Sequence, residues 1–267
     1  MSRRRSDRIA RLLITLLLGS PLLGTAAGSD RSPQTAPSGE ARTVVLLHGL
    51  GRSARNMLIL EWRLEARGYR VCNLDYDSRA ASIGRAADQV WASLRACAGP
   101  EATIDFVTHS LGGLVLRALL ERHEIPGAHR VVMLAPPNGG SEIVDRLRAF
   151  PLAASALGPL GSRLGTGEKD LPRTLSAPGI PFGVIAGSRW INPAGPLWLP
   201  GPHDGTVSVT STRLEGMSDH LVLPHTHSFI MNAAEVADQI DAFLRRGRFL
   251  RRERGACSSW VRDQDVG

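Results

Sequence analysis

The segment DFVTHSLGGLVL, residues 105–116, places Ser110 between a strand-like apolar run and a helix-like apolar run. Two glycines, Gly112 and Gly113, follow the serine closely. A sharp turn from strand to helix lifts a serine hydroxyl clear of a sheet, where it is accessible for nucleophilic attack. Such a hydroxyl needs an imidazole to accept its proton and a carboxylate to hold that imidazole. Ser110 is therefore a candidate nucleophile, and the alternative is an ordinary serine at a helix N-terminus.

A second glycine motif suggests a different chemistry. The segment GLGRSA, residues 49–54, fits the dinucleotide fingerprint Gly-x-Gly-x-x-Ala, and Asp75 ends the next predicted strand. This pattern would indicate a dinucleotide-dependent oxidoreductase. However, His48 directly precedes Gly49, and a His-Gly turn after an early strand supplies a backbone N–H to an oxyanion hole. We therefore favour nucleophilic catalysis and keep the oxidoreductase as the least favoured hypothesis.

Strand and helix patterns alternate along the chain around these motifs. Strands are predicted at residues 43–49, 69–75, 103–109, 130–137, 180–188 and 219–224, and helices at 53–68, 82–97, 111–123 and 228–246. This alternation predicts an α/β fold, a mostly parallel sheet with helices on both faces.

Residues 138–180 interrupt this alternation. They are rich in Gly, Pro, Ala and Leu and show no clear period. Because the segment follows a strand, we expect an insertion over the carboxyl edge of the sheet, where such folds keep their sites. Its apolar stretch at 149–165 predicts a lid or a wall that holds an acyl chain, and a packed loop is the alternative.

The charge of the chain lies at its two ends. The 267 residues, 43% of them hydrophobic, suffice for one large α/β core, and the net charge is +7. Residues 1–28 and 245–267 each carry a net charge of +4, which leaves −1 for residues 29–244. The central domain is thus nearly neutral, and we expect no nucleic-acid partner. The basic C-terminal tail, 248–267, is expected to be solvated, with weak contact to an anionic membrane surface as the alternative.

The N-terminal residues 1–28 have the outline of a secretory signal peptide. A basic stretch precedes an apolar run from Leu12 to Leu23, and small residues follow around Thr25 to Gly28. The apolar run is short for a bilayer span, so we expect cleavage and export, with a retained N-terminal anchor as the alternative. Residues 29–42 then form a polar linker before a folded domain at 43–247.

Three cysteines allow one disulfide in an exported protein. Cys72 lies in a predicted strand and Cys97 at the end of the next predicted helix, while Cys257 lies in the tail. A Cys72–Cys97 bond and two unbonded buried cysteines are both compatible with this pattern. No pair of cysteines has metal-ligand spacing, and we expect neither a metal nor another cofactor.

Five blocks of sequence, taken in order, resemble one known family. VVLLHGLG, FVTHSLGGLV, APPNGGSE, HDGTVSV and HTHSFIMN are similar to motifs of the α/β-hydrolase superfamily, in particular its bacterial lipase and esterase branch. The resemblance covers about residues 43–247. Thr108 departs from the superfamily pattern Gly-x-Ser-x-Gly, because it stands where the first glycine is expected. The resemblance implies the α/β-hydrolase fold and a serine hydrolase that cleaves small-molecule or lipid carboxylic esters through an acyl-enzyme.

The superfamily order of catalytic residues is serine, then acid, then histidine. Ser110 matches the first place, and the resemblance selects Asp204 in HDGTVSV for the second. An Asp-Gly turn without a catalytic role would produce the same dipeptide. Other candidate acids are Asp219, Asp170 and Asp75.

Two of the eight histidines follow the last predicted strand and precede the last helix, where the family keeps its base. They are His225 and His227. The segment HSFIM matches the family pattern with His227 in the catalytic place. Spacing alone does not separate two neighbours on a loop, so His225 stays the alternative.

The resemblance also implies the groups that surround the substrate. The backbone N–H groups of Leu50 and Leu111 would form the oxyanion hole. His48, Gly49, Asn138 and Ser141 are candidate substrate-binding residues, although PPNGGSE also fits a simple Asn-Gly turn. An acyltransferase of the same fold and a non-catalytic accessory member are the alternative functions. The sequence does not define the acyl chain, the alcohol or the oligomeric state.

Overall fold

The computed structural model describes residues 42–99, 102–191 and 195–251. Within them, six strands form one sheet of order β2-β1-β3-β4-β5-β6, and every neighbouring pair is parallel. The strands are β1 (Thr43–Leu47), β2 (Arg70–Leu74), β3 (Ile104–His109), β4 (Ala128–Leu134), β5 (Phe182–Gly187) and β6 (Asp219–Leu223). The predicted signal peptide and nearly all of the linker and the C-terminal tail lie outside the described residues.

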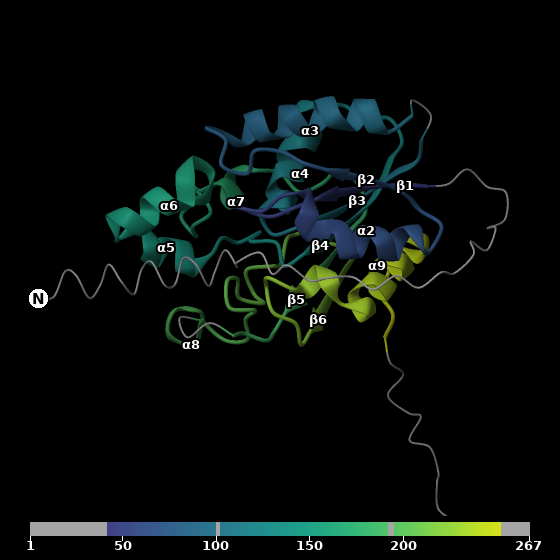
Figure 1. The fold of residues 1–267 in the computed structure, drawn as a ribbon. Coiled ribbons are helices and arrows are strands. Elements are labelled where there is room, and N and C mark those ends of the chain that lie inside the picture. The colour runs from purple at the N-terminus through teal and green to yellow at the C-terminus, as the bar shows by residue number, and fades with distance from the viewer. Residues whose placement is uncertain (1–41, 100–101, 192–194, 252–267) are drawn as a thin grey trace, which may run out of the picture.

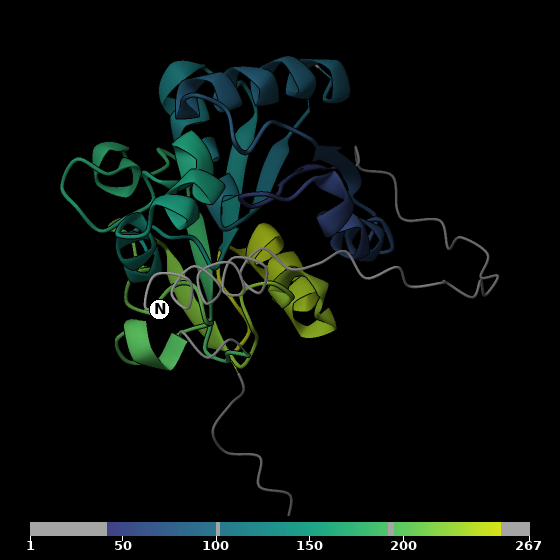
Figure 2. The same ribbon diagram turned by 60° about the vertical axis from the view of Figure 1, so that its left-hand side comes forward.

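Helices cover both faces of this sheet (Figures 1 and 2). One face carries α3 (Ile83–Cys97) and α4 (Leu111–Arg122), and the other carries α2 (Leu58–Glu65) and α9 (Ala234–Arg246). Short 3-10 turns precede α2 and α9, namely η1 (Ala54–Met57) and η2 (Ile230–Asn232). The last helix was expected from residue 228, but α9 begins at Ala234 because the chain turns through η2 first.

Alternate residues of the central strands pack into two separate cores. Val45, Leu47 and Phe106 pack with α3 and α4. Their neighbours in sequence, such as Leu46 and Val107, pack with α2 and α9. Successive side chains of a strand point to opposite faces, so a sheet covered on both sides requires the continuous apolar runs seen in the sequence.

The predicted insertion is a packed part of the domain. It contains α5 (Glu142–Arg148), α6 (Pro151–Gly161) and α7 (Leu171–Thr174), and Figure 1 shows α5 and α6 beyond one end of the sheet. The α6 segment is kinked at Gly158, whose φ is 70°, and Pro159 follows. Leu147 and Leu157 join the same core as α4. The insertion thus forms a wall of the domain, and a role as a lid stays a prediction.

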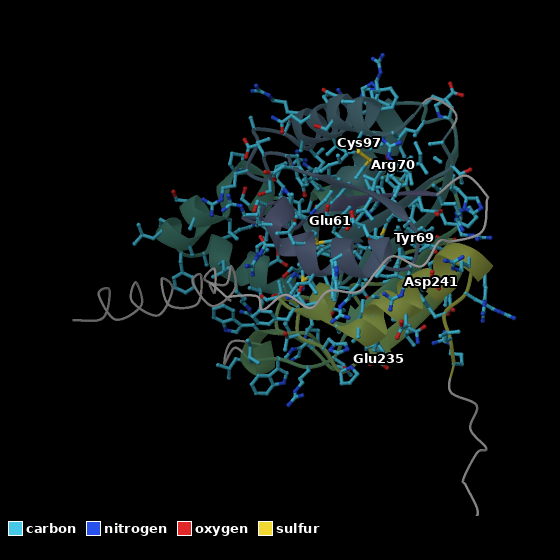
Figure 3. The ribbon with its side chains drawn as sticks, turned by 45° about the vertical axis from the view of Figure 1, so that its right-hand side comes forward. Glu61, Tyr69, Arg70, Cys97, Glu235 and Asp241 are labelled. Carbon is cyan, nitrogen blue, oxygen red and sulfur yellow. A yellow bond between two sulfur atoms is a disulfide. The ribbon has the colours of Figure 1, made fainter. Side chains whose placement is uncertain are left out.

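A disulfide joins Cys72 of β2 to Cys97 at the end of α3. The two Cα atoms lie 6.1 Å apart, and Figure 3 shows the bond in yellow beside Cys97. Of the two alternatives left by the sequence, the structure therefore contains the bonded one. It fastens the edge strand β2 to a helix that covers it.

A further short helix, α8 (Gly195–Trp198), follows β5 and was not expected from the sequence. Across the described ranges, no helix has both the length and the apolar composition that a membrane crossing requires.

Candidate active site

Ser110 occupies the turn between β3 and α4 with a strained backbone. Its φ is 52° and its ψ is −122°, and Ala135 is the other non-glycine among the described residues with a positive φ. Conformations of this kind persist only where the surrounding structure enforces them, and they concentrate at functional sites. Here the N–H of Ser110 donates to the carbonyl of Leu134 on β4, over 2.9 Å. The turn presents the Ser110 side chain at the carboxyl end of the sheet.

Two glycines that follow Ser110 allow close packing of the turn. A Cβ on Gly112 would lie 2.6 Å from the carbonyl oxygen of Leu47 and 2.8 Å from that of His48. A Cβ on Gly113 would lie 3.4 Å from Oγ1 of Thr108. Thr108, which departs from the superfamily pattern, is fully buried and faces Gly113.

Three predicted site residues come together at this turn. Nε2 of His227 lies 3.0 Å from Oγ of Ser110, and its Nδ1 lies 2.7 Å from Oδ2 of Asp204. Asp204 is 2% exposed and His227 is 7% exposed. The other carboxylate oxygen of Asp204 accepts from the N–H groups of Thr206 and Val207. The carboxylate is therefore fixed by backbone donors, and it orients the imidazole towards the serine.

The alternative histidine and acids lie elsewhere. Nε2 of His225 is 3.5 Å from Oε2 of Glu235 on α9, which is labelled in Figure 3. The alternative acids engage other side chains: Asp75 pairs with His48, Asp170 with Arg148 and Asp219 with Arg251. The serine, acid and histidine that the resemblance selected are thus the ones that the fold brings together.

His109, next to the serine, connects the two halves of the site. It is 2% exposed, and its Nε2 donates to the backbone carbonyl of His227 over 2.9 Å. Burial lowers the pKa of His109 well below the usual value, and the neighbouring His227, Arg52 and His48 lower it further. His109 is therefore neutral and ties the loop that carries His227 to the serine turn.

The backbone N–H groups of Leu50 and Leu111 are the ones predicted to bind an oxyanion. Leu111 is the first residue of α4, where a helix offers no internal acceptor. The turn at Gly49 is pressed against the serine, because a Cβ there would lie 3.2 Å from the Cβ of Ser110. Neither Leu50 nor Leu111 uses its N–H in a hydrogen bond within the described part of the chain.

Two of the candidate substrate-binding residues, His48 and Asn138, make internal contacts in the structure, and their role towards substrate stays a prediction. His48 is fully buried, stacks on Tyr76 and directs Nε2 to Asp75 over 2.8 Å. Asn138 is 3% exposed and donates its amide to the carbonyl of Thr212. Neither side chain lines the cavity at Ser110, because each is held by these internal contacts.

A cavity opens at Ser110. Gly49 and Ser141, the other two candidates, line it. Its apolar wall is contributed mainly by the insertion and consists of Leu50, Pro137, Ile143, Val144, Leu147, Leu157, Leu164 and Val207. Its polar wall consists of Arg52, His109, Ser110, Ser141, Thr206 and His227. Ser110 therefore faces a space suited to a hydrocarbon group.

Comparison with known proteins identifies a family for part of the chain. Residues 24–157 match the family described as "Domain of unknown function (DUF7379)". No curated protein sequence matches the chain.

Solved structures of several bacterial enzymes are similar to this chain. The mature lipase BlEst2 of Bacillus licheniformis is 18% identical, with a TM-score of 0.64 over 80% of this chain and 95% of that one. The metagenomic carboxyl esterase MGS0156 is 20% identical, with a TM-score of 0.54 over 79% and 71%. The phospholipase PlaB of Legionella pneumophila is 16% identical, with a TM-score of 0.58 over 76% and 57%. These likenesses confirm the predicted α/β-hydrolase fold.

Proposed function

The chain belongs to the family described as a domain of unknown function, DUF7379, and we propose that it is a serine hydrolase of carboxylic esters. One observation carries the proposal. Ser110, on a strained turn with φ of 52°, has its Oγ 3.0 Å from Nε2 of a buried imidazole whose Nδ1 contacts a buried carboxylate. An ordinary helix-capping serine needs neither the strain nor this alignment.

The proposed reaction proceeds through an acyl-enzyme. Oγ of Ser110 attacks the ester carbon while Nε2 of His227 takes the hydroxyl proton, and Asp204 stabilises the resulting imidazolium. The N–H groups of Leu50 and Leu111 bind the oxyanion that forms on the carbonyl oxygen. The C–O bond to the alcohol then breaks, and His227 gives its proton to the leaving oxygen. Water, deprotonated by His227, releases the acid and restores Ser110.

The apolar wall of the cavity supports an ester with a hydrocarbon acyl group. Ile143, Leu147 and Leu157 are side chains that would contact such a group. The names of the structural neighbours, a lipase, a carboxyl esterase and a phospholipase, agree with this substrate class.

Turnover of p-nitrophenyl acetate, butyrate and octanoate, with a burst of p-nitrophenol, tests the proposal. The acyl-enzyme predicts that added methanol or glycerol diverts part of the product from free acid to a new ester. Near-complete transfer to the alcohol at low concentration would favour the acyltransferase alternative. A protein that cleaves no ester and resists fluorophosphonate labelling would favour the non-catalytic alternative. Tight binding of NAD would instead support the oxidoreductase.

We also propose that the protein is exported and loses its signal peptide. The basic, apolar and small-residue pattern of residues 1–28 supports export, and so does the Cys72–Cys97 disulfide, because such bonds persist in oxidising compartments. The intact mass of the exported protein should place its N-terminus between Ala27 and Ser29. A full-length mass in the membrane fraction would show a retained anchor instead.

A further inference from the structure

Arg52 is distinctive among the residues that line the cavity. It follows the glycine turn at residues 49–51 and is half-buried. Of the described residues that line this cavity, it is the one arginine, and no lysine, aspartate or glutamate lines it. The cavity therefore holds one permanent positive charge and no carboxylate.

The guanidinium of Arg52 has no anionic partner in the described part of the chain. Its side-chain hydrogen bond goes to Oγ of Ser228, a neutral acceptor 3.3 Å away. Burial lowers the pKa of Arg52, yet an arginine stays protonated in proteins. By comparison, the half-buried Arg148 is paired with Asp170 at 2.6 Å. A partly desolvated guanidinium beside a nucleophile thus retains N–H groups for an anion from outside.

The position of Arg52 indicates which part of an ester it would meet. Ser228, its contact, directly follows His227 in the chain. In ester cleavage, the base gives its proton to the departing alcohol, so the alcohol must lie on the side of His227. The apolar side chains of α5, Ile143, Val144 and Leu147, line the same cavity. The cavity therefore offers apolar side chains for the acid part of an ester and one cation beside the His227 loop.

From this arrangement we propose that Arg52 binds a carboxylate or phosphate carried by the alcohol part of the ester. The inference rests on the proposed ester hydrolysis and specifies its substrate class, namely esters that join an apolar acid to an anionic alcohol. Arg52 takes no proton in this scheme. Its planar array of N–H donors matches the paired oxygens of either anion.

Three octanoate esters test the proposal on the full chain. One is 4-(octanoyloxy)benzoate, one is 4-(octanoyloxy)phenyl phosphate, and the neutral reference is 4-(octanoyloxy)benzamide. The wild type should show a higher kcat/KM for at least one anionic ester than for the amide, and the two anions distinguish carboxylate from phosphate recognition. Arg52→Gln should reduce the ratio of kcat/KM for the anionic ester to kcat/KM for the amide about 10-fold, as expected for loss of one charge-assisted contact. Arg52→Lys should keep part of it.

Arg55→Gln is the matched control. Arg55 lies three positions along the chain, is exposed and does not line the cavity, so its removal changes the net charge equally. The ratio should persist in this variant. An equal fall in both variants would indicate a long-range field and overturn the contact with Arg52. A ratio in Arg52→Gln within twofold of the wild type would overturn it as well.

Product inhibition tests the same contact without relying on a variant that folds. 4-Hydroxybenzoate or 4-hydroxyphenyl phosphate should inhibit the wild type more strongly than 4-hydroxybenzamide. Equal inhibition by all three, together with equal turnover of the three esters, overturns the role of Arg52 and leaves ester hydrolysis standing. A wild type that cleaves no ester and takes no fluorophosphonate overturns both proposals.

Discussion

His227 and Asp204 are joined twice. The imidazole Nδ1 lies 2.7 Å from the carboxylate, and the backbone N–H of His227 donates to the backbone carbonyl of Asp204 over 3.1 Å. The second bond does not depend on either side chain. The loop that carries the histidine is therefore held at the loop that carries the acid even when the carboxylate is changed.

Four single variants should show a ranked loss of esterase activity. His227→Ala should lose activity nearly as completely as Ser110→Ala, because no other imidazole contacts the serine within the described residues. Asp204→Asn should lower kcat about 10⁴-fold, since the tethered imidazole stays in place with the wrong tautomer. His225→Ala should keep most of the activity, because His225 faces Glu235.

The measurement is kcat on p-nitrophenyl butyrate at one pH, with circular dichroism to confirm folding. An inactive His225→Ala combined with an active His227→Ala would contradict the assignment of the base.

Gly112→Ala should disrupt the serine turn. The new Cβ would meet two backbone carbonyl oxygens within 2.8 Å, and backbone atoms cannot rotate away as a side chain can. We expect a loss of about 1–3 kcal/mol in the free energy of unfolding, typical of overpacking, together with loss of esterase activity. Gly99→Ala is the matched control, because nothing lies within 4 Å of its Cβ. Urea unfolding of both variants checks the result, and unchanged stability in Gly112→Ala would contradict the packing described.

Much of the scaffold could be predicted from sequence because its signals are local. Each of the six predicted strands overlaps an observed one, since a parallel strand buried on both faces must be a continuous apolar run. The segments 138–180 and 195–198 gave no such signal. Their helices are short, and α6 is broken at Gly158, so their stability depends on packing against the rest of the domain.

Some residues of the candidate site could be predicted from the sequence and others could not. Ser110, Asp204 and His227 lie in motifs that can be recognised along the chain. The contacts of His109 and Arg52 depend on loops far apart in sequence, because each reaches the segment at 227–228. The positions of His48 and Asn138 in the motifs predicted contact with substrate. In the structure His48 contacts Asp75 and Asn138 donates to Thr212, and both partners lie far away in the sequence.

The disulfide should contribute measurably to stability. Cys72 and Cys97 are 25 residues apart. Closing a loop of that length lowers the entropy of the unfolded chain and thereby raises its free energy by about 3.5 kcal/mol at 25 °C. We expect the double variant Cys72→Ser/Cys97→Ser to lose about that much in urea unfolding. In the denatured full-length protein from an oxidising compartment, thiol titration should find one free cysteine. Three free thiols would contradict the bond.

Mild acid should destabilise the fold through His220. Burial lowers the pKa of His220 to about 4, with Arg213 and Arg251 lowering it further and Asp219 opposing. An unfolded histidine has a pKa of about 6.5, so between pH 6.5 and 4 the unfolded chain binds more protons. The free energy of unfolding therefore falls as the pH falls through that window. His220→Gln should reduce this fall.

Thr212→Val provides the control for this pH dependence. It removes the hydroxyl that lies 2.9 Å from Nε2 of His220 but leaves the buried histidine to titrate. Urea midpoints at pH 7 and pH 5 should thus differ as much in Thr212→Val as in the wild type. An undiminished difference in His220→Gln would show that other groups cause the effect.

Fluorophosphonate labelling followed by peptide mapping tests the central claim most directly, because it detects an activated serine without knowledge of the substrate. The wild type should carry one adduct on Ser110 and none on Ser141, which also lines the cavity. Ser110→Ala should lose the label and about 10⁶-fold of its esterase activity, whereas Ser188→Ala, outside the cavity, should keep both. An unlabelled wild type, or a label that persists in Ser110→Ala, would contradict the account.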